Sequence, residues 1–179
     1  MIISVTGHRP GTIGLGSNYN SDSWKKLIEI IKDLLIEYKC TELITGLGLG
    51  VETASALATI ALKRTISNIK LHCAIPCKSF ASNWPEGSRK LYEDILSKAD
   101  IFTIVSGNTT YTPSVVQMKN QYLIDHSDMM IIVWNGIESG STYDCIQSVK
   151  KVGKKIILVD PRNNSIKKIN FEEKGRAIA

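Results

Sequence analysis

Thr45-Gly46-Leu47-Gly48-Leu49-Gly50-Val51-Glu52 is the stretch that decides the fold class of this 179-residue chain. It joins a short apolar run, Glu42–Thr45, to a longer amphipathic one, Val51–Arg64, which predicts a strand, a glycine-rich turn and a helix. Glycines lack the Cβ atom that would keep a phosphate or sugar away from the backbone, and the first turn of a helix offers free N–H groups. We therefore expect Gly46, Gly48 and Gly50 to form a binding loop for an anionic ligand.

The spacing of these glycines excludes two familiar nucleotide motifs. No Gly-Lys-Ser/Thr follows, so the loop is not a Walker motif, and it does not match the dinucleotide pattern Gly-x-Gly-x-x-Gly. Glu52 should lie in the first helical turn and face the same crevice. The stretch is equally consistent with a tight turn in which Glu52 only complements the helix dipole.

Short β-branched runs alternate with amphipathic segments along the whole chain, which is typical of a parallel sheet covered on both faces. We expect an α/β protein with a Rossmann-like three-layer fold, a mostly parallel central sheet and helices on both faces. The expected strands are Ile2–Thr6, Glu42–Thr45, Lys70–Ile75, Ile101–Val105, Met129–Trp134 and Lys155–Val159, and the expected helices are Asp22–Tyr38, Val51–Arg64, Pro85–Lys98, Ser114–His126 and Ser141–Val152.

One domain should span residues 1–161, because a chain of this length is too short for two. We expect residues 162–179 to form a polar, peripheral C-terminal tail with a disordered end, in which Ile166–Ile169 is at best an edge strand.

Ligands of open α/β sheets bind beyond the carboxyl ends of the strands. Gly7, His8 and Arg9 directly follow the first strand, where they offer a sharp exit, a titratable ring and a fixed cation. A second anion site is expected at the start of the fifth helix, where small residues and hydroxyls gather: Gly140, Ser141 and Thr142. Ser141 or Thr142 could also serve simply as the helix N-cap.

Polar and aromatic residues elsewhere add weaker signals. Lys119 and Asn120 fall on the fourth helix, and the pattern alone favours a position facing water. Trp84 and Tyr111 occur in long loops, where they could stack on a base or simply fill space.

Composition narrows the class of protein. No segment approaches the roughly 20 apolar residues of a membrane span, and no basic leader precedes the first strand, so we expect a cytoplasmic protein without membrane contact. The four cysteines are scattered and fit buried apolar positions, and no metal-ligand spacing or cofactor motif occurs. The net charge of +5 is spread over helix surfaces rather than concentrated in a basic run.

Several segments taken together and in order resemble the YpsA-like family of bacterial and phage proteins: Thr6–Pro10, Thr45–Glu52, Asn83-Trp84, Lys119–Gln121 with Ile124–Asp128, and Gly140–Thr142. That family belongs to the SLOG superfamily, with the LOG nucleotide phosphoribohydrolases and the DNA-processing protein DprA. The resemblance runs from Met1 to about Pro161. It implies a Rossmann-like fold and a nucleotide-type ligand, and it adds Trp84, Lys119 and Asn120 to the site residues.

The chain departs from the LOG enzymes at two places. Cys145 lies three residues beyond Thr142, where the LOG loop Pro-Gly-Gly-x-Gly-Thr-x-x-Glu has its glutamate, and Lys119-Asn120 replaces an arginine-lysine pair. Glu52 is then the carboxylate best placed to contact a ribose or assist glycosidic cleavage, and Asp144 is a poorer second.

Three functions remain open. The chain could sense or sequester a nucleotide-derived signal such as an ADP-ribose-like or cyclic species, as a phage protein would against host signalling. It could instead be a nucleotide N-glycosidase or ribosyl-transfer enzyme that uses Glu52. Single-stranded nucleic-acid binding of the DprA kind is the weakest of the three, because the sequence has no basic run or aromatic ladder. Self-association as a homo-oligomer is also expected, although the sequence locates no interface.

Overall fold

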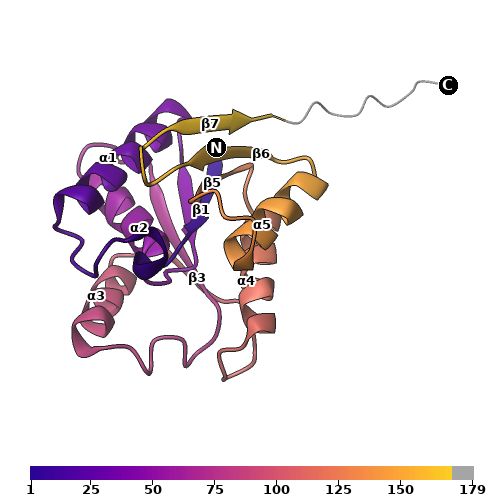
Figure 1. Ribbon diagram of the computed structural model, residues 1–179. Coiled ribbons are helices and arrows are strands. Elements are labelled where there is room, and N and C mark those ends of the chain that lie inside the picture. The colour runs from indigo at the N-terminus through magenta and orange to yellow at the C-terminus, as the bar shows by residue number, and fades with distance from the viewer. Residues whose placement is uncertain (171–179) are drawn as a thin grey trace.

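A computed structural model describes residues 1–170 and places a single seven-stranded sheet at the centre of the chain (Figure 1). The strands lie in the order β4-β3-β2-β1-β5-β6-β7, and every neighbouring pair is parallel except β6 and β7. Their bounds are β1 (Ile2–Gly7), β2 (Glu42–Thr45), β3 (Lys70–Ile75), β4 (Ile101–Ile104), β5 (Met129–Val133), β6 (Lys155–Val159) and β7 (Ile166–Ile169).

Helices cover both faces of the sheet, which confirms the predicted Rossmann-like α/β class. Three lie on one face and two on the other (Figure 1). The first group is α1 (Asp22–Glu37), α2 (Val51–Leu62) and α3 (Glu86–Ser97), and the second is α4 (Pro113–Asp125) and α5 (Gly140–Lys151). Each predicted element is present with its ends moved by two residues or fewer. The short 3-10 helix η1 (Pro10–Ile13) was not expected from the sequence.

The core divides into two layers, one on each side of the sheet. Ile3, Val5 and Leu71 face α1 and α2 in the larger layer, while Met130 and Ile132 face α4 and α5 in the smaller one. Strands buried on both faces need apolar side chains at consecutive positions, and β5 has them throughout. The four cysteines are buried within these layers, as the sequence predicted: Cys40, Cys73, Cys77 and Cys145.

The chain reverses its direction of travel across the sheet next to β1. Strands β2, β3 and β4 follow on one side of β1, and β5, β6 and β7 follow on the other. The loops after β1 and β5 therefore diverge and open a crevice at the carboxyl ends of the strands. Gly7 marks this point, since a Cβ there would lie 2.7 Å from the carbonyl oxygen of Val133 on β5.

β7 is an antiparallel edge strand beside β6. It lies at Ile166–Ile169, where the sequence predicted an edge strand at best. Its side chains are mostly exposed, in keeping with a peripheral segment. The boundary after residue 161 stays a prediction, and the predicted disordered end falls on residues 171–179, which lie outside the described part of the chain. Between residues 1 and 170, no helix combines the length and apolarity that crossing a bilayer requires.

Candidate ligand-binding cleft

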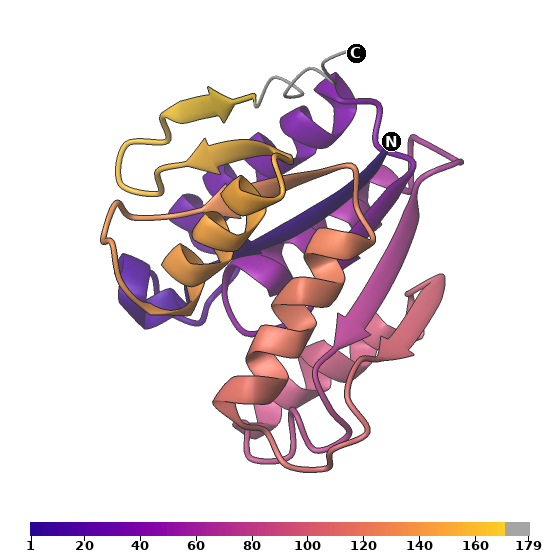
Figure 2. The same ribbon diagram turned by 90° about the vertical axis from the view of Figure 1, so that its right-hand side faces the viewer.

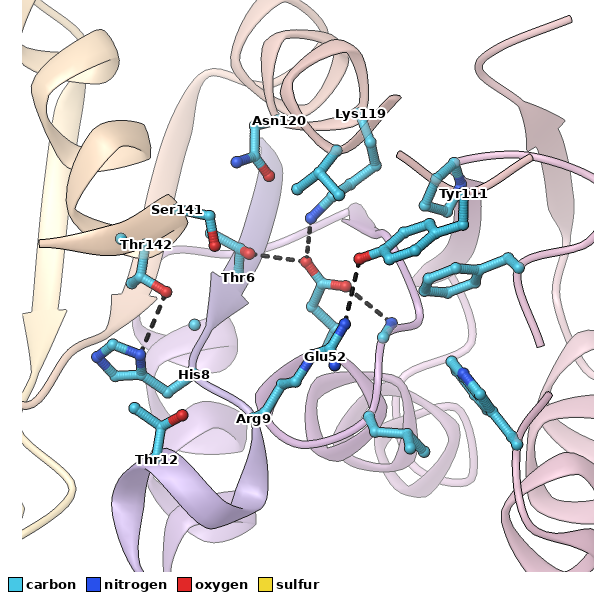
Figure 3. A pocket seen from close by; sticks show the side chains of 18 of the residues that line it. Thr6, His8, Arg9, Thr12, Glu52, Tyr111, Lys119, Asn120, Ser141 and Thr142 are labelled. Carbon is cyan, nitrogen blue, oxygen red and sulfur yellow. Dashed lines mark hydrogen bonds and ion pairs between the residues drawn. The ribbon is translucent and has the colours of Figure 1, made fainter. Parts of the chain in front are cut away.

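A cavity of about 370 Å³ opens at the carboxyl ends of the strands, beside the reversal point (Figure 3). Its size falls at the lower end of the range usual for small-molecule sites. Loops after β1, β2 and β3 and the N-terminal parts of α4 and α5 contribute to it. The lining residues are Thr6, Gly7, His8, Arg9, Thr12, Gly48, Leu49, Glu52, Pro76, Phe80, Trp84, Tyr111, Val116, Lys119, Asn120, Ser139, Gly140, Ser141 and Thr142.

Glu52 forms the floor of the cleft, and both of its carboxylate oxygens are occupied. Thr6 Oγ1 donates to Oε1 at 2.7 Å, and the Lys119 ammonium also contacts Oε1. The backbone N–H of Gly48 donates to Oε2 at 2.8 Å. Burial opposes ionisation of this side chain, but the Lys119 charge and these hydrogen bonds outweigh it and lower the pKa of the Glu52 carboxyl. Glu52 is therefore an ionised carboxylate within a buried ion pair.

The glycine-rich loop curls around this carboxylate. A Cβ on Gly46 would lie 2.6 Å from Lys119 Cδ and 2.8 Å from Glu52 Oε2, and one on Gly48 would lie 2.8 Å from the same oxygen. Gly50 has a φ of +104°, and a Cβ there would meet the His8 carbonyl oxygen at 2.5 Å. Gly46 and Gly50 do not line the cavity. These two glycines make room for the ion pair and for the loop after β1.

The N-terminus of α5 forms a polar wall on one side of the cleft. Ser139 is the N-cap residue, and Gly140, with a φ of +79°, begins the helix. Thr142 Oγ1 lies 3.4 Å from His8 Nδ1, so the loop after β1 is joined to the start of α5 (Figure 3). Free N–H groups and the helix dipole make such a helix start favourable for an anion.

His8 lies beneath this wall and is largely buried. Within residues 1–170 its Nε2 has no hydrogen-bond partner. Burial lowers the pKa of the imidazole, and the nearby Asn135 side chain opposes the shift only in part. His8 is therefore neutral at pH 7, with one ring nitrogen buried and unsatisfied.

An aromatic wall faces the polar one across the cleft (Figure 3). Phe80 packs against Trp84 and Tyr111, with ring centroids 5.0 and 5.2 Å apart. Arg9 reaches toward this wall, and its Nη2 donates to the Tyr111 hydroxyl at 3.3 Å. The Arg9 guanidinium is otherwise exposed, which leaves donors free between the two walls.

The structure brings most predicted site residues to one cavity. Gly7, His8, Arg9, Gly48 and Glu52 lie there, as do Trp84, Lys119, Asn120, Gly140, Ser141 and Thr142. Whether they bind a ligand stays a prediction. The sequence pattern that favoured water for Lys119 is wrong, because this lysine is buried on the Glu52 carboxylate. No local sequence pattern could signal this contact, since 67 positions separate the two residues.

Several lining residues were not expected as site residues. Thr6 is the last polar residue of β1 before Gly7 and could have been found by the strand-end rule. Thr12 comes from the unexpected helix η1, while Phe80 and Val116 read as ordinary apolar positions in the sequence. Among residues 1–170 no three His, Cys, Asp or Glu side chains gather as a metal site would require.

Comparison with known proteins assigns the family. The YpsA family model, described as the YspA SLOG family, matches residues 3–171. The chain belongs to this SLOG family. A UPF0398 protein of Halalkalibacterium halodurans is 31% identical over 152 residues, covering 84% of this chain and 80% of that protein. A UPF0398 protein of Bacillus cereus is 30% identical over 159 residues, covering 85% and 84% of the two chains. SLOG proteins are associated with binding of nucleotide-derived ligands.

Two solved structures share the fold of this SLOG chain. DNA processing protein A (DprA) of Streptococcus pneumoniae superposes with a TM-score of 0.56 at 12% identity, over 88% of this chain and 50% of that one. DprA of Helicobacter pylori, which binds single-stranded DNA, gives a TM-score of 0.56 at 15% identity, over 89% and 65%. The chain thus spans half to two thirds of the length of these proteins, and identities this low show the fold alone.

Proposed function

We propose that this SLOG protein binds a nucleotide or nucleotide-derived ligand in the cleft and senses or sequesters it without turning it over. The observation that carries the proposal is the state of Glu52: its two oxygens accept from Thr6, Lys119 and Gly48 in a buried setting. A carboxylate held this way has its preferred partners already, and a lowered pKa makes it a poor proton donor at neutral pH. Glu52 then organises the floor of the site.

The two walls support a ligand with an anionic end and an aromatic end. A phosphate fits the start of α5, where backbone N–H groups, Ser141 and Thr142 are available. Within the described part of the chain, Glu52 is the one carboxylate that lines the cavity, and Lys119 neutralises its charge. A base fits against Trp84 and Tyr111, since an aromatic ring offers a stacking surface to any base. Arg9 lies between the walls and can pair with phosphate oxygens.

The departure from the LOG loop also argues against turnover. Cys145, which occupies the position of the LOG glutamate, is buried in the core layer under α5, and burial raises its thiol pKa to about 11. A protonated thiol within an apolar core supplies neither a base nor a nucleophile to the cleft. Asp144 is exposed and does not line the cavity.

A thermal-shift screen with mass spectrometry of each mixture tests the proposal. The purified chain is melted with nucleotides, dinucleotides, ADP-ribose derivatives and cyclic nucleotides. The mass of each ligand is measured afterwards. A ligand at a hundredfold its Kd should stabilise the fold by about 2.7 kcal/mol. Stabilisation by intact ligand supports binding without turnover, whereas a released base or ribose product establishes an enzyme.

Variants of Arg9 and Trp84 locate the ligand within the cleft. Arg9→Ala should lower the affinity for phosphorylated ligands more than the affinity for the matching nucleosides. Trp84→Ala should lower the affinity for both, because stacking on a base does not depend on charge. Arg64→Ala, an exposed arginine just after α2, is the matched control and should leave affinity unchanged. If Arg9→Ala lowered the affinity for nucleosides and nucleotides equally, Arg9 would not contact the phosphate.

Nucleotide N-glycosidase or ribosyl-transfer activity is the second candidate, because Glu52 does lie in the cleft, where a ribose could reach it. It predicts product release that Glu52→Gln abolishes while ligand binding survives. A chain that gives no thermal shift with any nucleotide, but binds single-stranded DNA with a steep salt dependence, would instead favour the DprA-like alternative.

A further inference from the structure

We propose that two copies of this chain associate through the outer edge of β4, with the two β4 strands antiparallel and the two sheets joined into one. Among residues 1–170 the sheet has two open edges, β4 and β7, and an open edge presents unpaired backbone N–H and C=O groups. The two edges differ in charge, which is one of the features that protect an open edge from pairing. This inference does not depend on the proposed function of the cleft.

Charge protects the β7 edge and is absent from the β4 edge. β7 carries the exposed Lys167 and Lys168, and lysines on an edge strand discourage pairing with another chain. β4 reads Ile101-Phe102-Thr103-Ile104, and no charged side chain occurs from Ile101 through Met118. Phe102 is 51% exposed, although β3, the strand that pairs with β4, is almost wholly buried. An apolar, uncharged edge of this kind favours a partner strand.

Both faces of β4 suit burial by a second strand. Phe102 pairs in register with Cys73 and so lies on the face of α1, α2 and α3, where a second Phe102 could pack against it. On the opposite face Thr103 Oγ1 lies 2.9 Å from His72 Nε2, and His72 Nδ1 lies 2.9 Å from Glu42 Oε1. The polar side chains of that face already have partners, so covering them would leave none unsatisfied. Figure 2 shows β4 at the rim of the sheet, beyond the cover of α4.

The arrangement of charge around β4 fits a copy related by a twofold axis. Asp100 precedes the strand and is paired with Lys63 at 2.7 Å, whereas the residues after the strand, Val105 to Asn108, are uncharged. Antiparallel pairing places the charged start of each strand beside the uncharged end of the other. Like charges therefore do not meet, and each copy supplies the same apolar strand, as a twofold interface requires.

The mass of the full chain in solution, measured by light scattering after gel filtration over a range of concentrations, tests the proposal. The wild type should be a dimer. Phe102→Lys should be a monomer with a cooperative melt, because it places a charge in the proposed interface between the two β4 strands. Ile166→Lys on β7, at a residue 44% exposed, is the matched control and should remain a dimer. A monomeric wild type, or a dimeric Phe102→Lys variant, would overturn the proposal.

Cross-linking gives a second readout should Phe102→Lys fail to fold. The four native cysteines are buried, so an introduced surface cysteine is the accessible thiol within the described residues. Under mild oxidant, Phe102→Cys should form a covalent dimer and Ile166→Cys should not. The reverse pattern, or no covalent dimer from Phe102→Cys, would contradict pairing at β4. Ligand-induced thermal shifts measured on Phe102→Lys separate this result from the function of the cleft.

Discussion

Residue by residue, the floor of the cleft depends on the contact between Glu52 and Lys119, which joins α2 to α4 across the ends of the strands. Both side chains are more than nine-tenths buried. Attraction between buried charges offsets the cost of removing them from water only while both are present. The same pair therefore sets the stability of the fold and the shape of the site.

Glu52→Gln should lower the free energy of unfolding by about 3–5 kcal/mol, because it leaves the Lys119 ammonium buried without its counter-charge. Chemical denaturation measures the change. Glu29→Gln is the control, since Glu29 pairs with Lys32 on the exposed side of α1 and its loss should have little effect. In the double variant Glu52→Gln/Lys119→Met, removal of the orphaned charge should restore much of the loss. Equal effects of Glu52→Gln and Glu29→Gln would show that the buried pair is not needed.

His8 should make the stability of the chain depend on pH. Its folded-state pKa lies below the ordinary value of 6.5, so the unfolded chain binds more protons between those two values. The free energy of unfolding should therefore fall as the pH drops below about 6.5. His8→Gln should flatten this part of the profile, and chemical denaturation of both proteins across this pH range measures it. The lowered pKa of Glu52 acts in a more acidic window, below 4.5, and its contribution is lost as the pH falls through that window.

At the level of elements, the loop between β2 and α2 is shaped by the carboxylate it encloses. The sequence predicted a glycine loop at a helix start, and the structure has one, but two of its glycines avoid protein atoms rather than line the cavity. A glycine pattern indicates that another group approaches the backbone closely, but it does not distinguish a ligand from a protein side chain. The approaching group here includes a side chain from a helix far along the chain.

Gly46→Ala should destabilise the protein by about 1–3 kcal/mol, because the new methyl group would overlap Lys119 Cδ and Glu52 Oε2. It should also weaken ligand binding by displacing the floor of the cleft. Gly87→Ala on α3 is the matched control, since nothing lies within 4 Å of a Cβ there and alanine favours a helix. Thermal melts of the two variants compare their stability. A Gly46→Ala protein as stable as Gly87→Ala would mean that the loop can move aside.

At the scale of the whole molecule, the segment after Pro161 adds the antiparallel edge strand β7 to a sheet of six parallel strands. β7 buries little, and its link to the rest of the protein includes the exposed ion pair between Lys168 and Glu37. Such surface pairs contribute little to stability. Of the remaining strands, all except β4 are largely buried.

Truncation after Pro161 should leave a folded domain with a cooperative melt and a modestly lower Tm. Circular dichroism and a thermal melt of the shortened chain check this. The exposed edge of β6 should also raise the tendency to aggregate, because β7 no longer covers it. Loss of the cooperative transition would place the domain boundary later than residue 161.

The order of strands and helices could be predicted because each element carries its own local signal. Continuous apolar runs predicted β5 and β6, helical spacing predicted α1, and both signals are complete within one segment. Gly153, with a φ of +68°, follows α5 at the expected stop. The position of the cleft followed as well, since parallel strands bring their carboxyl ends to one edge.

The sequence by itself thus determined the α/β class, the succession of elements and the edge of the sheet at which the cleft opens. Only the tertiary structure decided that Lys119 is buried on Glu52, that Gly46 and Gly50 serve packing, and that Phe80 and Thr12 line the cavity. It also decided that β4 and β7 form the two open edges of the sheet. The physical reason is range: periodicity and turn preferences act between near neighbours, while ion pairs, cavity walls and strand order join residues that are far apart in the chain.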